Sequence, residues 1–450
     1  MDNLKNKYPV IDYLFWITFF LFTNPGGILE ALGEDTSKAG TIDARDFLFL
    51  VIFGLFFIIT YVTTIRDINY NKATGYLAVF GIYYFFVFGF IIPELKETPG
   101  YSLFLFIKKS RKTLYSLLMF AIVYRFFIRS YIVFFRIYLL SSFVILTLFI
   151  VGFITGFEIL PVERFNRGFV NIDRIFMVSE GFLPLLIPMG AAAIVFKSDF
   201  RWRNVVLINF ALMFIVYLLS ITRRDIIGTV IYFFIGMILF NYFQHKPIIP
   251  IKKIISVGFL FILFGFFISF AFPKYADAGV KGVKEAVHIV QYGETSTGKA
   301  DVRLGLGKEF MQNLIIDNLY FGTGFDNRWR GTGDKQGYET SDYPFLSAIA
   351  MTGIVGILIF LPIYILLVRN ILYDIKFIRN NKVDFRSFHF FIFVYLIIYF
   401  IYDLLQYMNW FLPVSLSRSI KWYSFFAMYL ATRYIFYANW KNKEEKLIST

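Results

Sequence analysis

NVVLINFALMFIVYLLSITRRDIIGTVIYFFIGMILFNYF, residues 204–243, contains two strongly apolar runs on either side of a short turn. Each run is close to the length that an α-helix needs to cross the hydrocarbon core of a bilayer. The turn carries two adjacent arginines, Arg223 and Arg224, with almost nothing around them that resembles a loop. The stretch therefore predicts a hairpin of two membrane-spanning helices with two permanent positive charges at its tip.

The composition of the whole chain has the same character. Of its 450 residues, 58% are hydrophobic and 17% are charged, whereas a soluble domain carries about a quarter charged residues. Apolar stretches long enough to span a bilayer recur along the entire chain. We therefore expect an all-α polytopic integral membrane protein, with residues 1–450 forming a single membrane domain.

Apolar runs bounded by charges or by proline and glycine predict about twelve spans. The first run contains Asp12, continues into TNPGG and lacks a small-residue cleavage site, which favours an uncleaved span over a signal peptide. The predicted spans are 8–23, 47–65, 74–92, 114–134, 138–157, 177–196, 204–220, 226–243, 254–272, 343–368, 387–404 and 416–438.

The distribution of charge orients these spans. With a cytoplasmic N-terminus, the cytoplasmic segments and adjoining helix ends hold 22 Lys and Arg against 7 Asp and Glu, and the opposite side holds 23 against 23. This asymmetry follows the positive-inside rule and makes both termini cytoplasmic. The basic composition therefore reports topology and gives no indication of nucleic-acid binding. One segment, KKSRK at 108–112, falls on the external side: either the third and fourth spans are misplaced, or these charges face an anionic headgroup or ligand.

The external side also receives one long segment, residues 273–342. A connection of this length without secondary structure is uncommon unless it is functional. LGLGKEFMQNLI (304–315) predicts an amphipathic helix within it, and the turn-rich stretch FGTGFDNRWRGTGDKQG (321–337) follows. A smaller external loop, 158–174, contains Arg164, Arg167 and Arg174.

Several external residues carry groups suited to an anionic substrate. The guanidinium groups of Arg223 and Arg224 would lie at the headgroup level, where their planar donors fit phosphate oxygens. The alternative is that they are interfacial arginines at helix ends without a ligand. Arg303, Arg328 and Arg330 lie in the long loop, and each is also explained as a solvated loop charge.

Asp342 stands where the long loop enters the tenth span. Its carboxylate could act as a general base towards an attacking hydroxyl in an external cavity. The alternative is a helix-capping role at the N-terminus of that span.

The residues that other kinds of catalytic or metal site require are absent or poorly placed. Cysteine is absent, which excludes disulfides, thiol catalysis and cysteine metal sites. The three histidines, His245, His288 and His389, are placed in a cytoplasmic connection, a helical stretch and a span, which argues against a metal cluster. No G-x-x-x-x-G-K-[ST] and no D-x-D sequence occurs, so neither an ATP-binding phosphate loop nor a metal- and nucleotide-sugar-dependent transferase is supported. We expect no cofactor and no metal.

The order of these elements resembles the O-antigen polymerase and O-antigen ligase superfamily of bacterial envelope enzymes. A T-x-S-R-like turn is matched by S-I-T-R at 220–223, and an arginine early in the periplasmic loop by Arg303 in ADVRLGLG. A glycine-bearing stretch is matched by NLYFGTGF with Gly322 and Gly324. The last element corresponds to DYPFLSAIAMTGIVG, where Asp342 replaces the histidine of the ligases, which favours a polymerase. The resemblance covers about 150 of the 450 residues.

The resemblance implies a substrate and a cellular location. The substrate would be an oligosaccharide repeat unit on undecaprenyl pyrophosphate, polymerised at the periplasmic face of the bacterial inner membrane. Arg223, Arg224 and Arg303 would stabilise the pyrophosphate, with Arg328 or Arg330 in reserve, and Asp342 would activate the acceptor hydroxyl. Membrane lipids, a chain-length regulator and a flippase are the other implied partners. A ligase that transfers finished glycan to another acceptor, and a lipid-linked oligosaccharide transporter, are the alternatives.

Overall fold

The fold was analysed in a computed structural model. The residues that it describes are 9–31, 44–60, 67–98, 101–157, 159–166, 173–177, 180–220, 223–246, 284, 288, 315–316, 318–324, 344–381, 383–405 and 416–448. The predicted ninth span and most of the long loop lie outside these residues.

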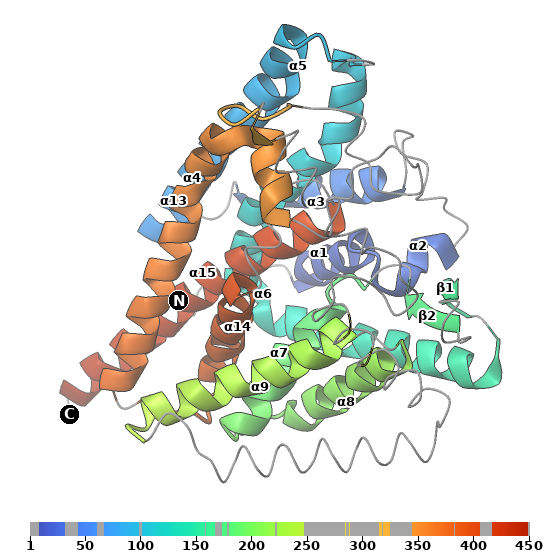
Figure 1. Ribbon diagram of the computed structural model, residues 1–450. Coiled ribbons are helices and arrows are strands. Elements are labelled where there is room, and N and C mark those ends of the chain that lie inside the picture. Colours follow the sequence, from blue (N-terminus) through green and yellow to red (C-terminus); the bar gives the residue numbers. More distant parts are fainter. Residues whose placement is uncertain are drawn as a thin grey trace.

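The described part of the chain is predominantly helical (Figure 1). The N-terminal helical elements are α1 (Pro9–Phe22), η2 (Pro25–Gly27), α2 (Ile28–Ala31), α3 (Ala44–Thr60), α4 (Ile68–Ile82), η3 (Tyr83–Ile91), α5 (Ile92–Leu95) and α6 (Leu103–Thr155). The later ones are η4 (Leu183–Leu185), α7 (Leu186–Val195), α8 (Arg203–Leu219), α9 (Arg223–Phe243), α13 (Pro344–Asn380), α14 (Phe388–Leu405) and α15 (Leu416–Ile448).

Five described helical segments are long and apolar enough to cross a membrane. They are Ile68–Leu95, Thr113–Thr155, Asp225–Phe243, Ile349–Asn380 and Phe388–Leu405. Shorter apolar helices lie at Pro9–Phe22, Leu183–Val195 and Arg203–Leu219; the first, with 14 residues, is only about 21 Å long. A helical architecture typical of membrane proteins is therefore present, whereas the count of twelve spans stays a prediction.

The structure places the boundary between the spans predicted at 114–134 and 138–157 elsewhere. Residues 114–155 belong to α6, which has 53 residues and consists of two helical parts separated by a kink at Ser130 (φ −139°, ψ 33°), so the division into two spans stays a prediction. No glycine or proline separates the two predicted spans, so nothing in residues 135–137 ends the helix. The two halves of α6 run in different directions in Figure 1. The KKSRK segment, predicted to lie in a loop, is inside the first half of this helix.

Several charges that looked misplaced in the sequence form ion pairs with each other in the structure. Arg129 of α6, beside the break, donates from Nε to the carboxylate of Asp12 in α1 at 2.8 Å, and both side chains are buried. Arg111, from the KKSRK segment, forms a 2.8 Å ion pair with Asp46 of α3. Because an unpaired buried charge is costly, these pairs explain how the apolar core accepts both arginines.

One small sheet interrupts the helical fold. Strands β1 (Val162–Asn166) and β2 (Asp173–Met177) form an antiparallel hairpin in which Val162 pairs with Met177. This hairpin lies in the smaller loop 158–174 and extends just beyond it. The sequence analysis predicted no strands there.

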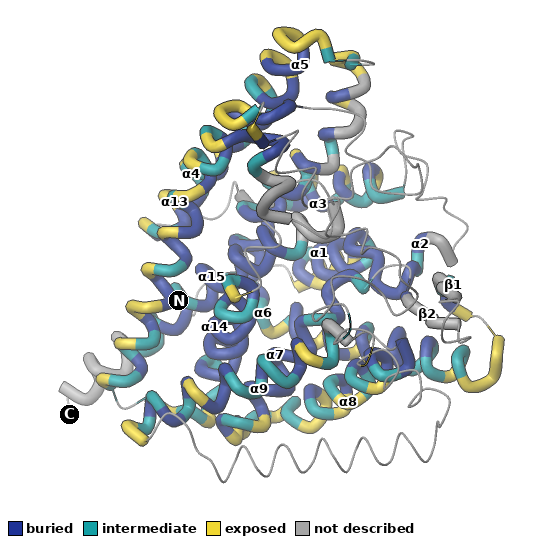
Figure 2. The backbone as a smooth tube through the Cα atoms, viewed as in Figure 1, coloured by how far each residue is buried: buried dark blue, intermediate teal, exposed yellow. Residues whose placement is uncertain are grey.

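The centre of the bundle is formed by α14 and the first half of α15 (Figure 2). Residues 422–431 of α15 are all buried, although many of them are aromatic or polar. Two of these polar groups have internal partners: Trp422 Nε1 donates to Asp403 of α14 at 3.0 Å, and the hydroxyl of Tyr429 donates to Asp374 of α13. In contrast, α4 and α13 alternate between buried and exposed residues along their length.

Three connections between helices lie together in the structure. The predicted topology assigns all three to one side of the membrane. The backbone N–H of Asp199 donates to the carbonyl oxygen of Arg386 at 3.0 Å. His245 Nε2 lies 3.2 Å from the carbonyl oxygen of Arg379, whose guanidinium lies 4.2 Å from the Tyr242 ring centroid. These contacts agree with a common side for residues 197–202, 244–246 and 379–386.

Candidate functional site

The structure describes the predicted arginine hairpin in part. Arg223 and Arg224 are the first two residues of α9, directly after residues 220–222, which connect it to α8. Their side chains are outside the part that the structure describes. The other four predicted site residues lie outside the described residues altogether: Arg303, Arg328, Arg330 and Asp342.

Next to this turn, acidic and tyrosine side chains converge from three parts of the chain. Glu180 and Asp225 both interact electrostatically with the hydroxyl of Tyr217, a buried residue near the end of α8. Asp225 follows the two arginines directly, so a carboxylate lies at the base of the turn. The set of side chains that we call the acid–tyrosine cluster is Glu180, Tyr217, Asp225, Tyr232, Tyr399, Tyr402 and Asp403.

The cluster continues from α9 into α14. The rings of Tyr232 and Tyr402 have their centroids 4.2 Å apart. Asp403, which is 1% exposed, interacts electrostatically with Tyr232 and Tyr399. Because a buried carboxylate is unfavourable in an apolar surrounding, its hydrogen bond from Trp422 is part of what stabilises it there.

Gly228 allows α9 and α14 to come this close. A Cβ atom at this position would collide with the hydroxyl of Tyr402. Glycine has no side chain at the point of contact, and the hydroxyl end of Tyr402 therefore reaches the backbone of α9 beside Tyr232.

We expect Gly228→Ala to destabilise the protein by roughly 1–3 kcal/mol, because overpacking forces a shift of Tyr402 or of α9. Thermal unfolding in detergent measures the effect. Gly54→Ala, in a helix where a Cβ would meet no neighbour, is the matched control. Combining Gly228→Ala with Tyr402→Phe removes the colliding oxygen and should restore part of the loss; no rescue would show that the collision is not the cause.

A second feature, which we call the glycine junction, joins residues 318–324 to residues 350–355. Gly322, Gly324 and Gly353 have φ values of +71°, +69° and +66°, which L-residues with a side chain rarely adopt. The prediction that the FGTGF glycines mark a tight turn is therefore confirmed. Gly353 interrupts α13, so that its first turns and its main body are separate helical segments.

Backbone hydrogen bonds across the junction replace those that the break removes. The N–H groups of Thr323 and Gly324 donate to the carbonyl oxygens of Ala350 and Met351 at 2.8 and 3.1 Å. In the other direction, Ile354 and Val355 donate to the carbonyl oxygens of Leu319 and Tyr320 at 2.9 and 3.0 Å. Irregular backbone inside a membrane protein is tolerated only when protein or a polar cavity satisfies it in this way.

Lys96, directly after α5, holds the junction from the opposite side. Its ammonium donates to the carbonyl oxygen of Gly322 at 2.7 Å and to the side-chain oxygen of Asn318. Burial lowers the pKa of this ammonium from its usual value. Tyr83 adds a hydrogen bond from its hydroxyl to the carbonyl oxygen of Thr352 at 2.7 Å. The start of η3 and the residue after α5 therefore both hold the glycine junction in place.

The two features are connected through α13. Tyr364 of this helix interacts electrostatically with Asp403 of the cluster, and its ring centroid is 5.4 Å from that of Trp422. Gly353 and Tyr364 are separated by about three turns, or roughly 16 Å along the helix axis. The glycine junction and the cluster are therefore joined by one helix, which contains Pro362 between them.

The sequence analysis did not single out Asp403, Glu180 or Lys96. A signal was present for Asp403, because it is the one acidic residue in the apolar run 388–405, and an ionisable residue within a span indicates function by default. Lys96 and Glu180 gave no such signal, since isolated charges beside spans are common. Among the described residues, no group of three His, Asp or Glu side chains is arranged to hold a metal ion.

Comparison with protein-family models, with curated proteins and with solved structures finds no match for this chain.

Proposed function

We propose that the chain is a membrane glycosyltransferase that polymerises oligosaccharide repeat units carried on undecaprenyl pyrophosphate. The reaction would take place at the periplasmic face of the bacterial inner membrane, in a protein of about twelve spans with both termini in the cytoplasm. The long loop 273–342 would be periplasmic.

The glycine junction is the observation that supports this proposal most directly. Two stretches of the resemblance, NLYFGTGF and TGIVG, are separated by residues 326–351 in the chain, yet they are hydrogen-bonded backbone to backbone. Two of the motif elements are therefore in direct contact, although Arg328, Arg330 and Asp342 lie outside the described residues.

The exposed residues of the junction fit a glycan. Tyr320 and Phe321 are 70% and 51% exposed, next to the buried glycines. Their rings offer flat apolar faces on which sugar rings can stack, while Lys96 supplies a cation at the same edge.

The proposed reaction moves the growing glycan onto a newly delivered unit. The hydroxyl of the acceptor sugar attacks the anomeric carbon of the carrier-linked glycan, and Asp342 takes the hydroxyl proton. A new C–O bond forms while the bond from the anomeric carbon to the pyrophosphate oxygen breaks, and the oxygen keeps the electron pair. Arg223, Arg224 and Arg303, with Arg328 or Arg330, would stabilise the charge that develops on the leaving group. The donor is already activated, so the reaction consumes no nucleotide.

The proposal is tested with purified protein and the lipid-linked repeat unit of the same strain, with and without a chelator and without nucleotide. A polymerase gives a carrier-linked ladder of products. A single transfer to a foreign acceptor identifies a ligase, and translocation without a covalent product identifies a transporter; either outcome overturns the proposal.

Arg223→Ala and Arg303→Ala are expected to lower the polymerisation rate about 10²–10³-fold, the usual cost of removing one group that stabilises transition-state charge. Asp342→Asn should lower it about 10²–10⁴-fold. Rates are measured on the lipid-linked substrate at equal protein abundance. Arg386→Ala, an exposed arginine in a predicted cytoplasmic connection, is the control and should keep the full rate. Unchanged activity of Asp342→Asn would exclude Asp342 as the base.

A further inference from the structure

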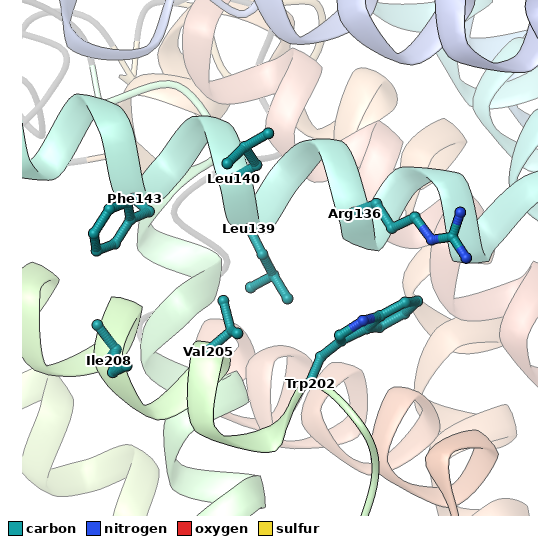
Figure 3. Close-up of a pocket in the computed structure, with 7 residues that line it drawn as sticks. All are labelled: Arg136, Leu139, Leu140, Phe143, Trp202, Val205 and Ile208. Carbon is teal, nitrogen blue, oxygen red and sulfur yellow. The ribbon is translucent and has the colours of Figure 1, made fainter.

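An apolar groove lies on the surface between the second half of α6 and the start of α8 (Figure 3). Its volume is about 370 Å³, which is within the range of small-molecule sites. The lining residues are Arg136, Leu139, Leu140, Phe143, Trp202, Val205 and Ile208.

The groove is open to the surroundings of the protein rather than sealed inside it. Leu140 and Ile208 are 67% and 50% exposed, and Phe143 is 42% exposed. In water such a strip of large apolar side chains would be unfavourable, but it is the expected surface of a helix that faces lipid. An acyl chain is therefore the kind of molecule that covers it.

The polar groups of the groove are gathered at one end. Figure 3 shows Arg136 and Trp202 at one end, and Phe143 and Ile208 at the other. The Arg136 guanidinium lies 5.6 Å from the Trp202 ring centroid and donates from Nη1 to the hydroxyl of Tyr13 at 3.1 Å. No carboxylate among the described residues pairs with this exposed guanidinium. Most of its donors are thus available to an external anion.

This order of groups matches one phospholipid molecule. Tryptophan and arginine prefer the interface between headgroups and hydrocarbon, and the guanidinium fork suits phosphate oxygens. Residues 135–137 and 197–203 are both assigned to the cytoplasmic side by the charge distribution, where anionic lipids concentrate. We propose that this groove binds an anionic phospholipid, with its phosphate at Arg136 and one acyl chain along Leu140, Phe143 and Ile208.

The inference is independent of the proposed reaction. It needs only that the groove faces the bilayer. The pyrophosphate of the proposed substrate would lie at the opposite surface, beside Arg223.

The test is native mass spectrometry of the full-length protein after delipidation and addition of phosphatidylglycerol or phosphatidylcholine. We expect one phosphatidylglycerol molecule to be retained preferentially. Arg136→Gln should weaken its binding roughly tenfold, which corresponds to about 1.4 kcal/mol. Arg201→Gln, an exposed arginine next to the groove that does not line it, is the matched control and should bind as the wild type does.

Further variants separate a ligand role of Arg136 from a structural one. Tyr13→Phe removes the hydroxyl that Arg136 contacts and should leave phosphatidylglycerol bound. Leu140→Trp, which fills the groove, should displace the lipid while Arg136 is intact. Equal retention by Arg136→Gln and Arg201→Gln overturns the proposal. The proposal is also overturned if the protein retains undecaprenyl phosphate in place of phosphatidylglycerol and this retention depends on Arg136. The groove would then bind the lipid carrier of the glycan.

Discussion

Replacing Gly353 with alanine is expected to detach residues 318–324 from α13. A Cβ atom on Gly353 would collide with the carbonyl group of Tyr320, and one on Gly322 would collide with that of Met351. Both neighbours are backbone, so neither can rotate away as a side chain could. Four backbone hydrogen bonds cross this contact, and each contributes about 0.5–1.5 kcal/mol. Loss of all four would cost about 2–6 kcal/mol. A side chain at the backbone conformation of Gly353 (φ 66°, ψ −179°), which is essentially restricted to glycine, costs about 1–3 kcal/mol more, so the total loss should be roughly 3–9 kcal/mol.

Two other glycines separate the causes of this effect. Gly156 also has a positive φ, +72°, but a Cβ there would meet no neighbour. Gly156 is in the left-handed helical region (ψ 3°), whereas Gly353 has ψ −179°, so Gly156→Ala measures the cost of a positive φ without a collision and gives a lower limit for Gly353. Gly75, in α4, has neither a positive φ nor a close neighbour, and Gly75→Ala should be neutral or slightly stabilising because alanine is the better helix former.

The detachment can be measured by cross-linking, since the chain has no cysteine of its own. Cysteines placed at Leu319 and Ile354, which are joined by a backbone hydrogen bond and have exposed side chains, should be joined by a short bis-maleimide in the otherwise unchanged protein. Gly353→Ala and Gly322→Ala should each abolish most of the cross-link and lower the melting temperature, while Gly156→Ala and Gly75→Ala keep the cross-link. A cross-link that survives in Gly353→Ala would mean that the junction does not depend on the close approach of the two glycines.

The hydrophobic pattern predicted helices well where a turn signal marked their ends. The run 387–404 corresponds to α14, and the runs on both sides of Arg223 correspond to α8 and α9, to within a few residues. The pattern failed between 114 and 157, because hydropathy detects a charge such as Arg136 but cannot decide whether it ends a helix. In the structure that arginine remains inside α6 and reaches the surface.

Pairing between distant residues was not predictable from the pattern. Arg129 and Asp12 each appeared as an anomaly in an apolar run, and they are 117 residues apart in the chain. Periodicity places a residue on a face of its own helix and contains nothing about the helix that packs there. The glycine junction could be predicted only in part. The glycines marked both segments that form the junction, but they gave no indication that the two segments are in contact.

Replacing Asp374 with alanine is expected to give the other large loss of stability. Asp374 of α13 is fully buried, and three side chains of α15 donate to its carboxylate. They are Arg433 Nε at 2.9 Å and the hydroxyls of Tyr429 and Tyr437 at 2.5 and 2.7 Å. These residues are spaced by four, so they lie on one face of α15. Removing the carboxylate leaves a largely buried guanidinium without its counter-ion, which costs about 3–5 kcal/mol.

A double replacement shows whether Asp374 and Arg433 stabilise the protein through their charges or only through packing. A buried ion pair can often be exchanged for apolar residues of similar volume at little cost. Asp374→Leu with Arg433→Met should therefore be more stable than either single variant, and thermal unfolding of the four proteins gives the coupling between the two positions. Tyr437→Phe, which removes one hydrogen bond, should cost only about 1 kcal/mol. Additive losses in the double variant would show that the two charges do not stabilise each other.

A loss of activity should accompany the loss of stability, although Asp374 is far from the candidate site. Asp374 follows Tyr364 by ten residues on α13, and Arg433 follows Trp422 by eleven on α15. The two helices therefore proceed in the same direction from the Tyr364–Trp422 contact to the ion pair, and they converge towards their C-terminal ends in Figure 1. We expect the ion pair to help hold α15 in the position from which Trp422 donates to Asp403. Polymerisation by Asp374→Ala should fall at temperatures well below its melting point, and the double replacement should recover stability before it recovers rate. Full activity of a folded Asp374→Ala would show that this register does not matter to the site.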